Sequence, residues 1–318
     1  MATQSEIWRI KTKLIEIVKA ETPITKRGAF YRAVSGRLFS STGENDYSKC
    51  LRYLNQLIAK HRQLDDDMFI DTTRIRREST GFADTGEYIR RFGRDYSRNA
   101  WLDQPLHIEL FSEKDAMSSI LAPIIGKYNI PFNVIRGNSS RKFLHDIGKK
   151  WQEIDKPILA LYAGDHDPSG INIARNTFKR LRAFAKDYER EKFTWSKLAV
   201  TPGDFIRLQH LSMPAKEKDL LLTRYRAEFD TNRCVEVDAL PSDEIRTRLE
   251  NSILKRLDKT QWDATSAQER VEQDQLMRLR NHIHSFGVAR SVEILNQEAD
   301  LDTPDDEEES ESDEDDDS

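Results

Sequence analysis

Residues 157–170 read PILALYAGDHDPSG, and this stretch decides the fold that the sequence predicts. The run Ile158–Ala163 is short and almost wholly apolar, which is typical of a strand buried on both faces of a parallel sheet. Pro168 then breaks the strand and opens a helix, so Asp165 and Asp167 lie just past the strand's carboxyl end. Ligands of open α/β sheets bind at that end of the strands.

The two aspartates after this strand are candidate metal ligands. Residues i and i+2 of an extended segment point the same way, so Asp165 and Asp167 can face one point. Repulsion between two carboxylates is relieved by a hard cation such as Mg²⁺. The alternative is a solvated loop in which Asp167 caps the next helix, and the spacing alone favours neither interpretation.

The composition predicts a protein with a substantial core and no membrane segment. The 318 residues allow two or three domains, with 37% hydrophobic and 33% charged residues. No apolar run is long enough to span a bilayer, and the N-terminus is amphipathic and charged, unlike a signal peptide. Cys50 and Cys234 form no CxxC motif, which argues against a cysteine-based zinc site. We expect a reducing, cytoplasmic setting, nucleoid-associated in a prokaryote.

Charge is distributed unevenly along the chain. Residues 298–318 contain 14 Asp or Glu and no Lys or Arg, so the net charge of −5 becomes +9 for residues 1–297. A basic body suits a polyanion such as DNA, whereas a self-repelling, low-complexity tail predicts disorder. We interpret the tail as a solubility appendage; the alternative is a DNA mimic that screens the basic body.

Residues 1–80 predict a winged helix-turn-helix DNA-binding domain. Apolar spacing and cap residues indicate three helices, over 5–20, 26–36 and 46–62. A short strand at 68–70 and a basic stretch at 73–77 follow, as expected for a wing that contacts phosphates. The alternative is an ordinary three-helix bundle, and the positive charge of the body favours DNA binding.

The second of these helices carries a candidate nucleophile. Tyr31 lies four residues after Arg27, so the two side chains share a face of the helix. A guanidinium beside a phenol can hold a phosphate against the hydroxyl and favour phenolate as nucleophile. A tyrosine in a short amphipathic helix is more often a packing residue, and the local pattern alone favours that interpretation.

Residues 81–105 predict a linker with a short helix. Arginines and aromatic rings are interleaved there without a clear period, which suits phosphate contact and base stacking along a nucleic acid. Packing between domains is the alternative. The residues concerned are Arg90, Arg91, Arg94 and Arg98 with Tyr88, Phe92, Tyr96 and Trp101.

Residues 106–240 predict a parallel α/β domain. Three strands alternate with helices in βαβαβ order, over 106–112, 132–136 and 158–163. Glu113 follows the first strand, so it falls on the same sheet edge as Asp165 and Asp167. Because Mg²⁺ prefers a few carboxylates together with substrate phosphates, this edge is a candidate Mg²⁺ site.

The rest of the chain predicts a basic helix, two strands and C-terminal helices. The basic helix is expected from 170 to about 190, and the strands over 196–200 and 234–240. Residues 241–297 predict helices over 243–257 and 266–297, which complete the fold or pack a partner subunit.

The order of these motifs resembles a known arrangement. Glu113 after one strand, a second strand that ends at Gly137, and Asp165-His166-Asp167 after a third resemble a Toprim domain, the metal-binding fold of topoisomerases, primases and related nucleases. With the preceding winged helix, residues 5–210 resemble the A subunit of topoisomerase VI (type IIB) and the related meiotic double-strand-break transesterase.

The resemblance includes the candidate nucleophile. The run Arg27-Gly28-Ala29-Phe30-Tyr31 is similar to the family's Arg-x-x-[Phe/Tyr]-Tyr motif. Gly28 departs from the acidic or polar residue that often follows the motif Arg, and the chain is shorter than the usual subunit.

The resemblance implies Mg²⁺-dependent DNA cleavage by tyrosyl transesterification. Tyr31 would attack a backbone phosphorus and leave a 5′-phosphotyrosyl bond, while Arg27 would steady the phosphate. Glu113, Asp165 and Asp167 would hold Mg²⁺, or Mn²⁺ in its place, and Glu113 would be catalytic. The family joins the Tyr of one protomer to the metal site of the other, so a homodimer on double-stranded DNA is implied. The chain has no Walker A sequence, so any ATPase would be a separate subunit.

Two other functions stay open at this point. One is a Toprim nuclease in which metal-activated water cuts DNA and Tyr31 only packs. The other is a non-catalytic winged-helix DNA-binding subunit with a vestigial metal site.

Overall fold

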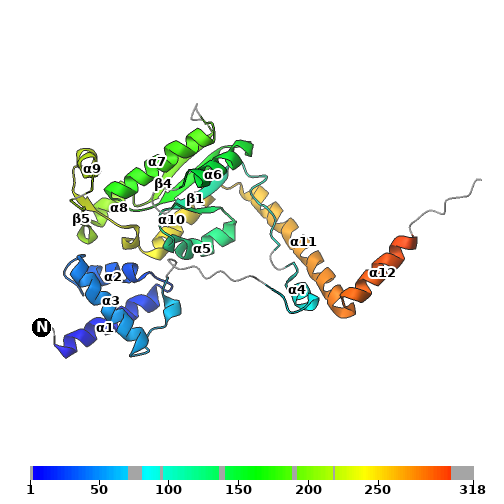
Figure 1. The fold of residues 1–318 in the computed structure, drawn as a ribbon, viewed down its shortest axis with the longest axis horizontal. Helices are drawn as coiled ribbons and strands as arrows, with labels where there is room; N and C mark the ends of the chain where they lie inside the picture. Colours follow the sequence, from blue (N-terminus) through cyan, green and yellow to red (C-terminus); the bar gives the residue numbers. More distant parts are fainter. Residues whose placement is uncertain are drawn as a thin grey trace, which may run out of the picture. The chain divides into compact units, whose positions relative to one another are not determined.

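A four-stranded parallel sheet organises the larger part of the computed structural model (Figure 1). Its strands lie in the order β2-β1-β3-β4, which is parallel throughout and confirms the predicted α/β class and βαβαβ order. In the central pair, His107 lies opposite Ile158 and Ser112 opposite Ala163. The strands are β1 (His107–Ser112), β2 (Phe132–Val134), β3 (Ile158–Ala163) and β4 (Phe193–Ala199).

The chain divides into two units. One comprises Met1–Arg76 and Asn99–Trp262, and the other Arg77–Arg98 and Asp263–Ser318. None of the helices in the described parts of the chain is both long and apolar enough to cross a membrane. The structure describes residues 3–70, 81–93, 96–135, 140–187, 192–217 and 219–301.

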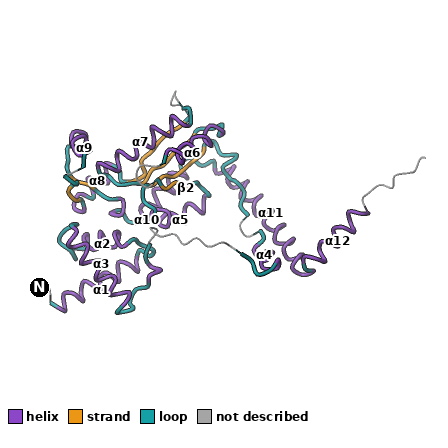
Figure 2. Tube along the Cα trace, viewed as in Figure 1, coloured by secondary structure: helices purple, strands orange, loops and turns teal. Residues whose placement is uncertain are grey.

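Helices cover both faces of the sheet (Figure 2). β3 is therefore buried on both faces, as its apolar run predicts. Leu159 and Leu161 pack on one side against α5 (Ala116–Tyr128) and α10 (Ser242–Leu254). Ala160 and Tyr162, one residue out of phase, pack on the other side. There the cover is α6 (Arg141–Glu153) and α7 (Pro168–Phe184).

Three N-terminal helices form a further core of the larger unit. They are α1 (Gln4–Ala20), α2 (Lys26–Ser35) and α3 (Glu44–Ala59), close to the predicted positions. The Thr25 side chain caps α2 by accepting the Gly28 N–H at 2.8 Å. The strand expected at 68–70 is instead the 3₁₀ turn η1 (Asp66–Met68) and one bridge between Ile24 and Phe69. The predicted wing at 73–77 lies outside the described residues.

The prediction of a strand over 234–240 is largely wrong. Only β6 (Arg233–Cys234) pairs with β5 (Met213–Pro214), and the chain then turns through the 3₁₀ turn η3 (Val237–Ala239). The alternating pattern arises because Glu236 and Asp238 both form ion pairs, rather than because one face of a strand is buried.

The remaining helices differ from the predicted boundaries. α7 begins at Pro168, because Asp167 caps its start. It ends at Phe184, before the predicted limit near residue 190. The helix predicted over 266–297 is two helices, α11 (Lys259–Phe286) and α12 (Val288–Leu301), separated by Gly287 at φ +76°. The predicted acidic tail beyond Leu301 lies outside the described residues. The short helices are α4 (Thr85–Arg91), α8 (Pro202–Arg207), α9 (Leu222–Phe229) and the 3₁₀ turn η2 (Gln209–Leu211).

A glycine pair tests the packing of α6 on α7. A Cβ at Gly148 would lie 2.4 Å from the Phe184 Cβ and 2.8 Å from its backbone carbon, whereas a Cβ at Gly126 of α5 meets nothing within 4 Å. We expect Gly148→Ala to lower the free energy of unfolding by about 1–3 kcal/mol through overpacking. Gly126→Ala, the control, should raise it by about 0.5–1 kcal/mol, because alanine is the better helix former. Equal effects of both substitutions in urea unfolding would contradict the packing.

Candidate functional site

The sheet order places a topological switch point between β1 and β3. The chain continues from β1 to β2 on one side, while β3 lies on the other side of β1. Connections therefore diverge at the carboxyl ends of β1 and β3, which is where ligands bind in open α/β sheets. Glu113 follows β1 and Asp165 follows β3, so these two predicted site residues meet at this position.

Glu113 and Asp165 are in direct contact. Glu113 Oε1 accepts a hydrogen bond from the Asp165 backbone N–H at 3.0 Å, and Asp165 Oδ1 accepts one from the Val237 N–H at 2.7 Å. Asp165 is only 8% exposed, and burial raises its pKa to about 8 although Lys114 opposes the change. Burial also raises the pKa of Glu113, and the charge of Asp167 raises it further. The carboxylates are thus close enough to repel one another.

Asp167 has the capping role that the sequence offered as an alternative. Its Oδ1 accepts a hydrogen bond from the Gly170 N–H at 2.6 Å at the start of α7. A Cβ at Gly170 would lie 2.8 Å from the Asp165 carbonyl oxygen, so glycine permits the tight turn that holds both aspartates. The capping role and the electrostatic contact with Glu113 coexist.

His166 points into a packed aromatic group. Its Nδ1 lies 2.9 Å from the Tyr225 hydroxyl, and its ring contacts Phe205 and Phe229. Burial lowers its pKa to about 4, so the ring is neutral at pH 7. The backbone of His166 pairs with Val235, which draws the segment after β6 against the site.

The sequence prediction missed the cation of this site, Lys114. Its Nζ lies 3.0 Å from Asp165 Oδ1, 2.7 Å from Asp238 Oδ2 and 3.4 Å from Glu236 Oε2. Burial would lower the pKa of Lys114, but these three carboxylates outweigh it and raise the pKa well above its usual value. The side chain stays 25% exposed. The available signal was a lysine directly after Glu113 at a strand end.

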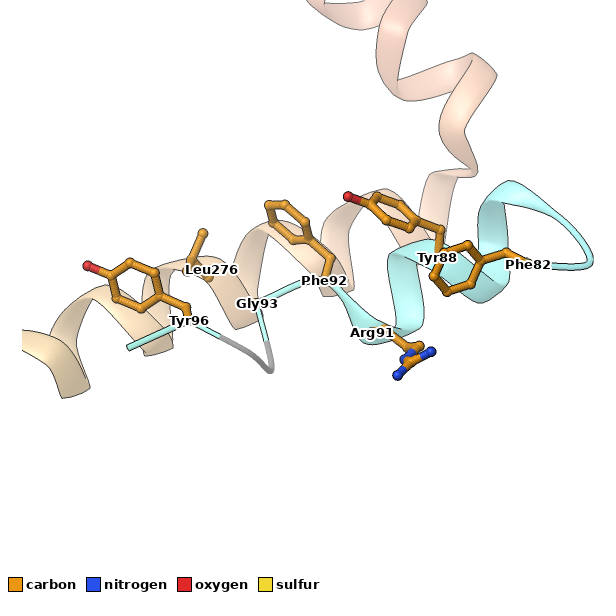
Figure 3. Close-up of a pocket in the computed structure, with 7 residues that line it drawn as sticks. All are labelled: Phe82, Tyr88, Arg91, Phe92, Gly93, Tyr96 and Leu276. Carbon is orange, nitrogen blue, oxygen red and sulfur yellow. The ribbon is translucent and has the colours of Figure 1, made fainter. Parts of the chain in front are cut away.

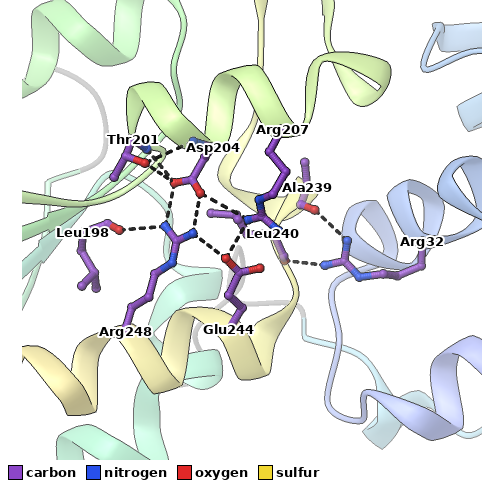
Figure 4. A network of polar contacts seen from close by, with 9 residues as sticks. All are labelled: Arg32, Leu198, Thr201, Asp204, Arg207, Ala239, Leu240, Glu244 and Arg248. Carbon is purple, nitrogen blue, oxygen red and sulfur yellow. Dashed lines mark hydrogen bonds and ion pairs between the residues drawn. The ribbon is translucent and has the colours of Figure 1, made fainter.

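The segment 236–240, which follows β6, holds α2 against the α/β region. Thr25 Oγ1 donates a hydrogen bond to Asp238 Oδ1 at 2.7 Å, and Arg27 pairs with Glu236 at 3.0 Å. Arg32 donates to the carbonyls of Ala239, at 2.7 Å, and Leu240 (Figure 4). Glu236 and Asp238 therefore connect the Lys114 site to the helix that carries Tyr31.

Tyr31 is buried between α2 and the α/β region. It is 0% exposed and packs in the core shared by β1, β3 and α5. The Arg27 guanidinium lies 5.5 Å from its ring centroid, as the shared helix face predicts. The Tyr31 hydroxyl has no hydrogen-bond partner within the described residues. Burial raises its pKa, and Glu236 adds to the effect while Arg27 opposes it, so the phenol is neutral in this state.

The donor set fits a divalent cation by its chemistry. Glu113, Asp165 and Asp167 carry the carboxylate oxygens that Mg²⁺ prefers, and burial, together with repulsion between neighbouring carboxylates, raises the pKa of the first two. Across the described ranges, no three acidic, His or Cys side chains are grouped to hold an ion as they stand. Lys114 takes that place at Asp165, so a cation would compete with its ammonium.

The Arg-rich linker packs within the second unit. Its aromatic residues line a pocket of about 480 Å³ against α11 (Figure 3). Tyr96 and Arg98 both bond to Glu272 of that helix. Trp101 is instead buried in the larger unit, where its Nε1 donates to the Tyr128 carbonyl at 2.7 Å. Arg94 lies outside the described residues. The pocket lining is Phe82, Tyr88, Arg91, Phe92, Gly93, Tyr96 and Leu276.

Comparison with protein-family models finds none that matches the chain, and a search of curated proteins finds no match either. The function is therefore inferred from the residues at the switch point.

The electrostatic state of Asp165 gives a stability test. Its folded pKa of about 8 exceeds the ordinary value of 3.8, so folding favours the protonated form. The associated stability is complete below about pH 4 and is lost as the pH rises through 8. Asp165→Asn mimics the protonated form, so at pH 9 it should unfold with about 1–3 kcal/mol more free energy than wild type. At pH 4 the two proteins should be alike.

Asp204 provides a control of opposite sign. Burial raises its pKa, but hydrogen bonds from Arg248 and Thr201 outweigh burial and hold the pKa well below its usual value. Its contribution is present at neutral pH and is lost as the pH falls. Asp204→Asn should therefore lower the melting temperature at pH 7. Thermal melts in which Asp165→Asn is less stable than wild type at pH 9 would contradict the raised pKa of Asp165.

Proposed function

We propose that this protein is a Mg²⁺-dependent enzyme that cleaves double-stranded DNA by phosphoryl transfer, with a winged-helix N-terminal region and a Toprim-like α/β region. The observation that carries the proposal is the contact of Glu113 with Asp165 at the switch point. Asp167 is close enough for its charge to raise the pKa of Glu113. Bound Mg²⁺, or Mn²⁺, would neutralise charge on the phosphate and the leaving oxygen. The +9 charge of residues 1–297 supports a polyanionic substrate.

Tyr31 is the proposed nucleophile. Its helix is tied by Arg27 and Thr25 to the segment that also contacts Asp165, so the phenol belongs to the same end of the α/β region as the carboxylates. In the reaction, the phenol proton passes to water as the phenol oxygen bonds to phosphorus, and the 3′ oxygen of the cut strand leaves with the electron pair of the broken P–O bond and takes a proton from water. Arg27 would hold the phosphate as a bidentate donor.

The burial of Tyr31 sets a condition on this mechanism. A phosphate reaches the 0% exposed phenol only after α2 separates from Glu236 and Asp238. Such separation suits a homodimer in which the tyrosine of one protomer serves the carboxylates of the other. We propose that a separate ATPase subunit drives this separation.

The same burial favours a second candidate, a metal-dependent nuclease. In that case water attacks the phosphorus at the carboxylates, and Tyr31 contributes only packing between α2 and the α/β region. The two candidates differ in the product, because only the tyrosine leaves a covalent bond between protein and DNA.

Tyr31→Phe separates the candidates without a folding penalty. Because the hydroxyl has no hydrogen-bond partner within the described residues, the free energy of unfolding should change by less than about 1 kcal/mol. We expect wild type with Mg²⁺ or Mn²⁺ to linearise supercoiled plasmid, with ends that enter a gel only after detergent and protease. Tyr31→Phe should leave the plasmid intact.

Glu113→Gln is the matched control, because it removes one charge from the carboxylates and leaves Tyr31 in place. It should abolish cutting under either mechanism. Free ends produced by Tyr31→Phe would establish the nuclease instead. Wild type that binds DNA equally with and without metal, and never cuts it, would reveal a non-catalytic DNA-binding subunit.

A further inference from the structure

Two polar groups are buried beside the carboxylates without hydrogen-bond partners. Within the described residues, neither the Lys197 Nζ nor the Tyr162 hydroxyl makes a hydrogen bond, and both atoms are shielded from solvent. Tyr162 is 0% exposed, and Lys197 is partly buried. A buried ammonium without a partner costs free energy, so native proteins rarely keep one without a use.

The sheet brings these two residues together. Tyr162 of β3 and Lys197 of β4 are direct partners in the parallel pairing. Tyr162 stacks on Trp195, which lies two residues before Lys197 and so shares its side of the strand. The register then shifts, with Ala163 opposite Ala199, so Leu198 is an extra residue at the strand end. Such bulges occur next to active sites, where they redirect a side chain.

Both groups are directed at the carboxylates. A Cβ at Gly164 would lie 2.4 Å from the Tyr162 hydroxyl, so the phenol ends over the residue that precedes Asp165. Burial raises the pKa of Tyr162, and Glu113 and Asp165 raise it further. Burial lowers the pKa of Lys197 to about 8, against the attraction of the same carboxylates.

The end of β4 is held firmly, so this arrangement is built into the fold. Arg248 of α10 donates to the Leu198 carbonyl at 3.2 Å and to Asp204 Oδ2 at 2.6 Å (Figure 4). Asp204 in turn caps α8 together with Thr201. The network fixes the backbone on the carboxyl side of Lys197, while the pairing with β3 fixes it on the strand side.

We propose that Lys197, positioned by Tyr162, is an anion subsite whose flexible side chain extends to bind a non-bridging oxygen of a DNA phosphate beside Glu113, Asp165 and Asp167. An ammonium is a strong donor to an oxyanion, whereas the Tyr162 hydroxyl stays buried beside Lys197. This inference rests on the proposed function, which supplies the DNA substrate. It adds to that function the residue that neutralises the phosphate from the β4 side.

The subsite predicts opposite effects on a cation and on an anion. Lys197→Met keeps most of the side-chain volume but removes the charge. Binding of Mn²⁺ alone, measured from the free-ion electron paramagnetic resonance signal, should tighten about fivefold, because a like charge near the carboxylates is gone. Affinity for a 20-base-pair duplex in metal-free buffer, measured by fluorescence anisotropy, should fall about tenfold.

Matched variants separate this role from a structural one. Lys179→Met removes the same charge from an exposed position on α7 and should change neither affinity. Lys197→Arg should retain duplex binding. Tyr162→Phe should weaken duplex binding about threefold and leave Mn²⁺ binding unchanged. A structural lysine would instead shift both affinities in the same direction in Lys197→Met.

Inorganic phosphate, titrated by ³¹P NMR, identifies the source of the anion. A loss of duplex binding in Lys197→Met, with or without a loss of phosphate binding, supports the subsite. A loss confined to inorganic phosphate overturns the assignment to DNA, and unchanged duplex binding or a parallel loss of Mn²⁺ binding overturns the subsite. Failure of the wild type to bind Mn²⁺ or to cut DNA would refute the proposed function, yet the duplex comparison would still decide the role of Lys197.

Discussion

The ammonium of Lys114 is the contact on which the rest of the site depends. It lies within 3.4 Å of three carboxylates, from Asp165, Glu236 and Asp238, that come from two distant parts of the sequence. Lys114 forms the ion pairs of Asp165 and Asp238 in this partly buried space, and removal of one partner of such a pair strongly destabilises a fold. Lys114 thus holds the segment around η3 against the carboxyl end of β3, and that segment in turn holds α2.

This arrangement joins two functions of charge in one place. Near the switch point, Lys114, Lys197 and Arg27 interact with a larger number of acidic groups among the described residues, namely Glu113, Asp165, Asp167, Glu236 and Asp238, with Asp204 beyond them. A divalent cation would balance that excess of acidic groups, and it would compete with Lys114 for Asp165. Because Lys114 also contacts Glu236 and Asp238, any change at Asp165 is felt at the contacts that cover Tyr31. The covered tyrosine and the carboxylates are therefore parts of one electrostatic network.

Some sequence patterns in this chain specify one local structure, and others do not. The run Ile158–Ala163 could be assigned because an apolar segment of that length, closed by Gly and Pro, has few alternatives to a buried parallel strand. The segment 234–240 shows a two-residue alternation but is a strand only at its first residue, because Glu236 and Asp238 face ion pairs rather than solvent. Periodicity records that alternate residues have different surroundings; it does not record what those surroundings are.

Sequence patterns alone were enough to predict the α/β class, the parallel pairing in a βαβαβ unit and the shared sheet edge of Glu113, Asp165 and Asp167. These follow from local patterns and from the handedness of crossovers, which need no knowledge of distant contacts. Only the tertiary structure decided that Lys114 is the cation of that edge, that Tyr31 is covered, and that Lys197 pairs with Tyr162 across two strands. The contacts that cover Tyr31 join distant parts of the sequence, and the bond from Thr25 to Asp238 spans 213 positions. Local sequence patterns carry no signal for such contacts, because they arise when separate elements pack.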